Sequence, residues 1–166
     1  MNKYPASQLH WNSIDNFSAS EFKRVDLTKL DECVILNAQS FREALGERVH
    51  PSPAKGAFVR TEGSSESRHY AVGRLCDAGD WFAEGHIADS FLAAVSEGYG
   101  GIGIYVDTEF RDEPWPMIHL DNRNQKLFWI CEKVDGEDVY TYVYPHKNPG
   151  VLRDFLKKLS EVKICH

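Results

Sequence analysis

The sequence predicts an α+β domain in which a small, mostly antiparallel sheet is flanked by helices. Three observations predict it. Apolar residues recur at helical spacing in three separate stretches. Short buried or alternating runs typical of strands lie between these stretches, and an Asp-Gly pair at 135–136 marks a β-hairpin turn. With 166 residues, 42% of them hydrophobic, the chain is long enough to bury a core as a single domain, residues 1–166.

The helices follow from apolar spacing and from capping residues. A short helical turn is predicted at 18–23, where Ser18 and Glu21 have the spacing of a capping box. A long helix, 28–46, comes next, and Gly46 is its natural stop. Two further amphipathic helices are predicted at 87–97 and 149–162. The residues expected to face inward on the 87–97 helix are Ile87, Phe91, Leu92 and Val95.

The strands are predicted from short apolar runs bounded by turn residues. A segment at 74–82 is extended at its ends and carries small residues inside. The segment 49–55 holds two prolines and is expected to be loop or extended chain, and 107–116 is expected to be a polar excursion. The remaining strands are predicted at 56–60, 103–106, 117–120, 127–132 and 139–144.

The charge balance and the cysteines limit the possible partners. The formal net charge is -6, from 19 Lys+Arg against 25 Asp+Glu, and no basic run occurs, so a nucleic acid partner is not expected. No apolar run has the length of a membrane span or a signal peptide, so we expect synthesis in the cytoplasm. The four cysteines form no C-x-x-C pair, which excludes a zinc finger and favours free thiols.

Two histidines and several carboxylates lie among glycines and turn residues, where the backbone can bring them together. Catalytic zinc usually takes three ligands from His, Asp and Glu and keeps a fourth position for water. His69 and His119 are the best imidazole candidates, and the carboxylate ligand is expected from Asp77 or Asp80. Side chains alternate along a strand, so His119 and Asp121 point to the same face. A metal ligand and a proton-transferring carboxylate can therefore share one cleft.

The motifs Ser67-x-His69 and Ala78-x-Asp80, followed by a strand that carries His119, resemble the family of zinc D-alanyl-D-alanine carboxypeptidases and phage endolysin peptidases. That family shares its fold with the hedgehog signalling domain. The resemblance covers residues 16–132. It leaves the predicted hairpin and helix of 133–166 as an extension. Three more segments carry it: Phe17-Ser-Ala-Ser-Glu-Phe22, Phe41-Arg-Glu-Ala-Leu-Gly46 and Gly100-Gly-Ile-Gly-Ile-Tyr105.

The resemblance implies one Zn²⁺ per chain, held by His69, His119 and an aspartate. Asp80 keeps the family's Ala-x-Asp triplet but requires four inserted residues after His69. Asp77 requires one inserted residue and places Leu75 where a small Ala is expected, so it is the alternative to Asp80. Loops tolerate insertions, which favours Asp80.

The resemblance also implies roles for four other residues. The family's glutamate three positions before the last histidine is replaced here by Pro116. Asp121 is therefore the predicted base, and Glu113 is the alternative. Arg60 resembles the arginine that binds or polarises the substrate carbonyl or carboxylate, a role that suits a guanidinium. Ser67 would orient a ligand or the substrate.

The candidate ligands predict a zinc hydrolase. The family resemblance implies a zinc metallopeptidase that hydrolyses a peptide bond in peptidoglycan stem peptides, at D-Ala-D-Ala or at L-Ala-D-Glu. Because no signal peptide is recognised, a phage or prophage product is expected, which reaches the cell wall by phage-type release or as part of a virion. The alternative is a zinc-stabilised binding or virion structural module without activity. The altered His-to-Asp spacing and the missing Glu-x-x-His favour that alternative. The glycines at 100–103 lack a P-loop lysine and are expected to form a tight turn behind the site.

Overall fold

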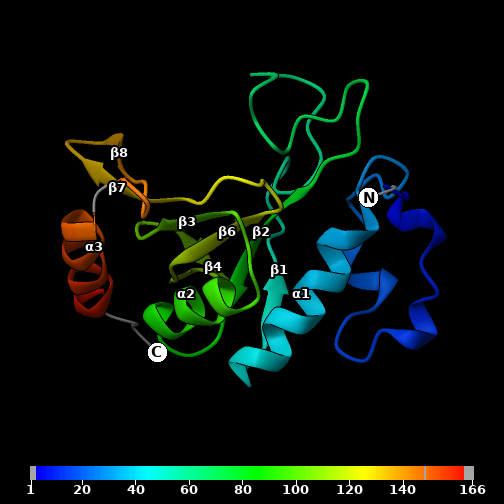
Figure 1. The fold of residues 1–166 in the computed structure, drawn as a ribbon. Helices are drawn as coiled ribbons and strands as arrows, with labels where there is room; N and C mark the ends of the chain where they lie inside the picture. Colours follow the sequence, from blue (N-terminus) through cyan, green and yellow to red (C-terminus); the bar gives the residue numbers. More distant parts are fainter. Residues whose placement is uncertain (1–2, 148, 163–166) are drawn as a thin grey trace.

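A computed structural model describes residues 3–147 and 149–162, and it confirms the α+β class. In this part of the chain a six-stranded sheet has the order β1-β2-β6-β3-β7-β8, and all neighbouring strands are antiparallel except the parallel pair β3–β7 (Figure 1). A separate two-stranded ribbon pairs β4 with β5. The strands are β1 (Val49–Pro51), β2 (Ala78–Ala83), β3 (Gly101–Tyr105), β4 (Glu109–Phe110), β5 (Glu113–Pro114), β6 (Met117–Asp121), β7 (Leu127–Val134) and β8 (Glu137–Val143).

The helices lie close to where the sequence predicts them. The long helix α1 begins after Asp31, whose side chain accepts a hydrogen bond from the amide of Cys33, and ends at Gly46, which has a left-handed φ of 75°. The capping box of Ser18 and Glu21 is present and caps a short 3-10 turn. The helices are α1 (Glu32–Leu45), α2 (Ile87–Ser96), α3 (Pro149–Glu161), and the 3-10 turns η1 (Ala6–Gln8), η2 (Trp11–Ser13) and η3 (Ala19–Phe22).

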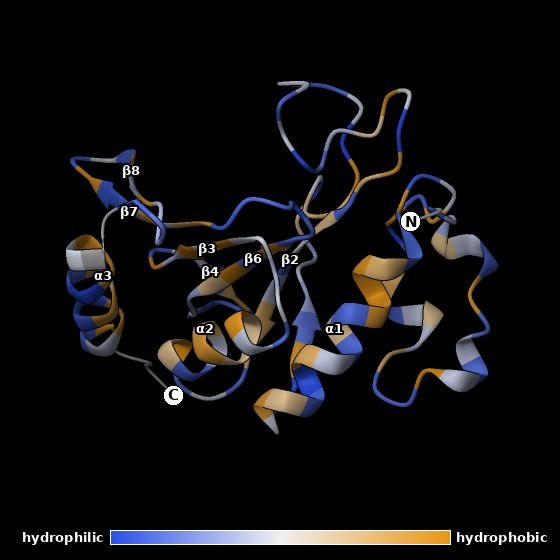
Figure 2. Cartoon of the chain, in the orientation of Figure 1, coloured by the Kyte–Doolittle hydropathy of each residue, from blue (hydrophilic) through white to orange (hydrophobic). Residues whose placement is uncertain are grey.

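One face of the sheet packs against helices. The ring of Phe91 in α2 lies 5.0 Å from Phe128 in β7 and 5.1 Å from Phe155 in α3, so both helices meet the sheet on the side of Phe128. Apolar residues also run along α2 and the central strands (Figure 2). Because side chains alternate along β6, the buried Ile118 lies on the opposite side of the strand from His119. The polar face is therefore the one that carries the histidine.

The strand predicted at 56–60 is absent: the segment is irregular and bent, and Arg60 makes an isolated bridge with Tyr70. Ala57 and Phe58 are nevertheless buried. The carbonyl of Ala57 accepts a hydrogen bond from the amide of Asp80 at 2.9 Å, and the Phe58 ring lies 5.0 Å from Trp81. The apolar run therefore marks a segment packed against β2 rather than a strand of the sheet.

The inward face of α2 differs from the predicted one at two positions. Leu92 is 55% exposed and Val95 is 38% exposed, whereas Ile87 and Phe91 are buried as predicted. Small residues complete the inner stripe, so large apolar side chains are not needed at every inward position. The buried stripe at helical spacing consists of Ile87, Ser90, Phe91 and Ala94.

A long loop, residues 52–77, connects β1 to β2 and rises above the sheet (Figure 1). Arg74 holds part of it in place, because its guanidinium donates hydrogen bonds to the backbone carbonyls of Ser65, Ser67 and Tyr70. This loop carries His69, so its fold decides where the first histidine lies.

Cys33, Cys76 and Cys131 are free thiols, as predicted, and Cys165 lies outside the described residues. Within the described ranges, none of the helices has the length and apolar character needed to cross a membrane.

Candidate metal centre

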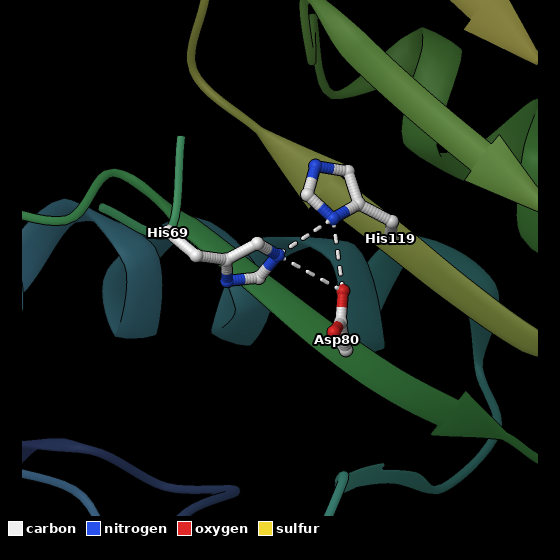
Figure 3. Close-up of side chains that lie close together, drawn as sticks. All are labelled: His69, Asp80 and His119. Carbon is white, nitrogen blue, oxygen red and sulfur yellow. Dashed lines mark hydrogen bonds and ion pairs between the residues drawn. The ribbon is translucent and has the colours of Figure 1, made fainter. Parts of the chain in front are cut away.

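Three ligand-type side chains meet on the polar face of the sheet: His69 from the loop, Asp80 from β2 and His119 from β6 (Figure 3). Nε2 of His69 lies 3.0 Å from Nδ1 of His119 and 3.3 Å from Oδ1 of Asp80. Nδ1 of His119 lies 2.8 Å from the same oxygen. All three side chains are buried. One atom of each residue therefore faces a common point.

These distances fit a metal ion. Zinc binds nitrogen and oxygen ligands at about 2.0–2.1 Å in tetrahedral geometry, which places the ligand atoms about 3.3 Å from one another. The three separations observed here, from 2.8 to 3.3 Å, are close to that value. Two imidazoles and one carboxylate are also a typical ligand set of catalytic zinc. His69, Asp80 and His119 thus form a possible metal site.

The pairing of β2 with β6 brings the second and third of these residues together. Asp80 and His119 are direct partners in the antiparallel ladder, and their side chains lie on the same face. Asp77 is three residues before Asp80, so the alternation of the extended chain does not place it on that face. Its carboxylate contacts Lys3 at 3.1 Å and Arg68 at 3.3 Å instead. The structure therefore groups Asp80, and not Asp77, with the histidines.

Backbone contacts fix the orientation of His69. Its Nδ1 lies 2.9 Å from the carbonyl oxygen of Phe58. A carbonyl can only accept, so Nδ1 carries the proton and Nε2 presents its lone pair to the other two side chains. The amide of Arg60 donates to the His69 carbonyl at 2.8 Å and anchors the backbone. Burial opposes charge on the ring, but the Asp80 carboxylate outweighs it and raises the pKa of His69 above its usual value.

His119 lies between two carboxylates. Its Nε2 is 3.1 Å from Oδ2 of Asp121, on the side of the ring away from Asp80. Burial alone would lower the pKa of His119, but hydrogen bonds to Asp121 and Asp80 raise that pKa to about 9. For Asp80, burial by itself would raise the pKa, but the two neighbouring histidines hold this pKa well below its ordinary range. In the metal-free protein, the two carboxylates therefore favour the charged form of the His119 ring.

Asp121 is fully buried and is held by two partners. Besides His119, it accepts hydrogen bonds from Arg123, whose Nε lies 2.8 Å from Oδ1. These bonds lower the pKa of Asp121 although burial opposes this. A carboxylate that binds the outer nitrogen of a ligand histidine fixes its tautomer and orientation. The contacts thus give Asp121 a positioning task, and its predicted action as a base stays a prediction.

Two glycines of β3 make room for this arrangement. A Cβ at Gly101 would lie 2.2 Å from Oδ2 of Asp121, and a Cβ at Gly103 would lie 2.2 Å from the indole of Trp129. The Trp129 ring in turn lies 5.0 Å from His119. Only glycine permits these approaches. The glycine-rich stretch forms a strand beside the site, so the predicted tight turn is wrong.

The other predicted residues differ in their distance from the three ligands. Nη2 of Arg60 lies 4.0 Å from Oδ2 of Asp80, and this side chain is 47% exposed. The hydroxyl of Ser67 accepts a hydrogen bond from the amide of His69 at 3.3 Å, which stabilises the turn before that residue. Glu113 lies in the exposed ribbon strand β5 and does not line the cleft over the ligands.

A cleft of about 270 Å³ opens over the three ligands. It is lined by further residues that the sequence motifs do not mark. Arg123 had a signal, because H-x-D-x-R places every second residue on one side of an extended chain. The others lie on separate elements, and nothing local marks them. The unassigned lining residues with polar or aromatic groups are Glu66, Arg68, Tyr105, Arg123, Trp129 and Tyr140.

Comparisons of the chain with known protein families, with curated proteins and with solved structures give no match. The geometry and chemistry of its own residues therefore indicate what the chain can do.

Proposed function

We propose that this chain is a zinc-dependent peptidase that hydrolyses a peptide bond in peptidoglycan stem peptides, of the D-Ala-D-Ala carboxypeptidase or L-Ala-D-Glu endopeptidase type. The observation that carries the proposal is the group of His69, Asp80 and His119, whose ligand atoms are 2.8–3.3 Å apart at the base of a cleft. The substrate class rests on the resemblance of the sequence motifs to that peptidase family.

Each ligand residue has a defined task. His69 presents Nε2, His119 presents Nδ1 and Asp80 presents Oδ1. When bound, zinc supplies Lewis-acid chemistry, which polarises the scissile carbonyl and makes water acidic enough to attack it. Asp121 keeps the Nε2 proton of His119 in place, so that Nδ1 stays available to the metal.

Arg60 is suited to bind the substrate carbonyl oxygen. Its guanidinium lies at the edge of the ligand group, 4.0 Å from Asp80, and half of the side chain is accessible. Its Nε donates to the carbonyl of Gly56 at 2.7 Å, which fixes the base of the guanidinium and leaves its end facing the cleft. A positioned donor of this kind stabilises the negative charge that develops on the carbonyl oxygen.

For proton transfer, the cleft contains a candidate besides Asp121. Glu66 and Asp80 are the carboxylates that line the cleft in the described part of the chain. Asp80 faces the two histidines, whereas the carboxylate of Glu66 has no ion pair among the described residues and is exposed. We assign proton transfer to Glu66, because a base must reach both water and substrate.

One observation favours the second candidate function, a zinc-stabilised binding or virion structural module without activity. Asp121 is buried and bound to Arg123, and Glu113 lies outside the cleft. Neither carboxylate predicted as the base thus stands free over the ligands. If Glu66 does not transfer protons, the site holds a metal for structural purposes.

Metal content and cell-wall digestion together test the proposal. Elemental analysis should find one zinc per chain in the wild type and in Asp77→Ala, and a loss of zinc in His69→Ala, Asp80→Ala and His119→Ala. Asp77→Ala is the matched control, since it removes an aspartate that lies near the site but contacts Lys3 and Arg68. The zinc-loaded wild type should then release new amino groups from purified peptidoglycan. Zinc binding without any cleavage would reject the peptidase and favour the binding module.

A further inference from the structure

A second cleft, of about 770 Å³, adjoins the metal cleft. The two clefts share Arg68, from the loop that carries His69, and Arg123, which follows β6. The two guanidinium groups therefore lie where one cleft passes into the other. In a peptide substrate bound over the three metal ligands, the residues next to the scissile bond would reach these two arginines.

Basic residues gather in this region of an acidic protein. The whole chain has a formal net charge of -6. The metal cleft nevertheless has three arginines against two carboxylates, and a bound zinc ion would add two further positive charges. The second cleft has four basic residues against two acidic ones, and two of the four, Arg68 and Arg123, are shared with the metal cleft. The basic residues of the two clefts are Lys3, Arg60, Arg68, Arg123 and Lys126.

Both arginines are held in place and still have donors to offer. Arg123 uses Nε and Nη2 to bind Asp121, and Arg68 uses Nη1 to contact Asp77. The other guanidinium nitrogens, Nη1 of Arg123 and Nε and Nη2 of Arg68, have no hydrogen bond to any residue in the described ranges. The side chains are 24% and 28% exposed. Partly buried guanidinium groups held by a partner carboxylate are well suited to bind a second carboxylate.

We propose that Arg68 and Arg123 form a carboxylate-binding subsite, which recognises an acidic group of the substrate beside the scissile bond. This inference rests on the proposed function. It also gives Asp77 a task, since its carboxylate orients Arg68. The acidic group is either the free C-terminal carboxylate of the peptide or the side chain of an acidic residue. The subsite makes the charge of the substrate, and not only its shape, a condition for efficient cleavage.

Two pairs of synthetic peptides separate these sources. The first pair ends in D-Ala-D-Ala as the free acid or as the carboxamide. The second pair contains an L-Ala-D-Glu or an L-Ala-D-Gln bond. Zinc-loaded wild type should prefer the acidic member of one pair by about 10- to 100-fold in kcat/KM, the range expected for a hydrogen bond to a charged group. The pair that shows the preference identifies the source of the carboxylate.

The variant Arg68→Gln tests the arginine directly. It should lower the acid preference at least tenfold, whereas Arg68→Lys should keep part of it. In both variants Asp77 keeps its ion pair with Lys3, whose Nζ lies 3.1 Å from Oδ2 in the wild type, so we expect the fold to survive. Arg153→Gln is the matched control, because this exposed arginine of α3 lines neither cleft. A wild type without acid preference, or an unchanged preference in Arg68→Gln, would overturn the subsite.

Binding measurements separate this inference from the proposed function. If the zinc-loaded protein cleaves none of the peptides, calorimetry compares the binding of the acidic and neutral members. Tighter binding of an acidic member, lost in Arg68→Gln, would retain the subsite while the peptidase proposal fails. Equal binding of both members, or no binding of either, would overturn the subsite as well.

Discussion

The substitution Asp121→Asn separates a positioning role from the role of a base. In the structure, Oδ2 of Asp121 lies 3.1 Å from Nε2 of His119, and the carboxylate is fully buried. A hydrogen bond that involves a charged group contributes about 1.5–3 kcal/mol. Because about 1.4 kcal/mol corresponds to a factor of ten, the loss of this bond should weaken zinc binding by about 10- to 100-fold. The reason is that the ring of His119 loses its fixed orientation.

The assay is a competition titration with a chromophoric zinc chelator. It should be run above the pKa of His119, which is about 9, because a proton competes with zinc for this ring at lower pH. Glu113→Gln is the matched control, since it neutralises an exposed carboxylate that does not line the cleft. Its zinc affinity should equal that of the wild type.

One result would refute this reasoning. If Asp121→Asn binds zinc as tightly as the wild type but loses peptide hydrolysis, then Asp121 acts on the substrate or its water and does not position His119. A thermal unfolding curve should accompany the titration. Arg123, which loses its charged partner, is 24% exposed and can turn to solvent, so we expect the variant to fold.

Three further predictions follow from the same contacts. Zinc affinity should rise by up to about tenfold per pH unit from about pH 6.5 to about 9, because His119 must release its proton to bind the metal. In the metal-free protein, the charged ring's contribution to stability should be present in full below about pH 6.5 and be lost as the pH rises through about 9. Zinc titrations and melting curves over this pH range check the two predictions, and flat profiles would contradict them. Gly103→Ala should lower the free energy of unfolding by about 1–3 kcal/mol and shift the Trp129 fluorescence, because the added Cβ would overlap the indole. Urea unfolding measures this loss, and an unchanged midpoint would contradict the close approach. Glu66→Gln should lower kcat by about 10²- to 10⁴-fold and leave zinc affinity unchanged, and full activity would remove Glu66 as the proton acceptor.

The sequence by itself determined the elements whose signals are local. The stop of α1 at Gly46 and the capping box at Ser18 could be predicted because each involves neighbouring residues in the chain. The alternation that places His119 and Asp121 on one face is equally local, and the structure shows both side chains in contact. Local periodicity was misleading where small residues complete a buried stripe, so Leu92 was expected inside and is exposed.

Only the tertiary structure decided which aspartate joins the histidines. Spacing along the chain left both Asp77 and Asp80 open, and the register of β2 against β6 places Asp80 opposite His119. The loop that carries His69 reaches this place through contacts with Phe58 and with Arg60, which no sequence pattern encodes.

The same holds for the glycines of β3 and for the arginines of the cleft. Gly101 and Gly103 are required because Asp121 and Trp129, from neighbouring strands, occupy the space of a Cβ. Such requirements arise between segments that are distant in sequence and become neighbours only when the sheet assembles. A sequence can therefore name the kinds of residue that a metal site needs, but the packing of its strands determines which of them meet.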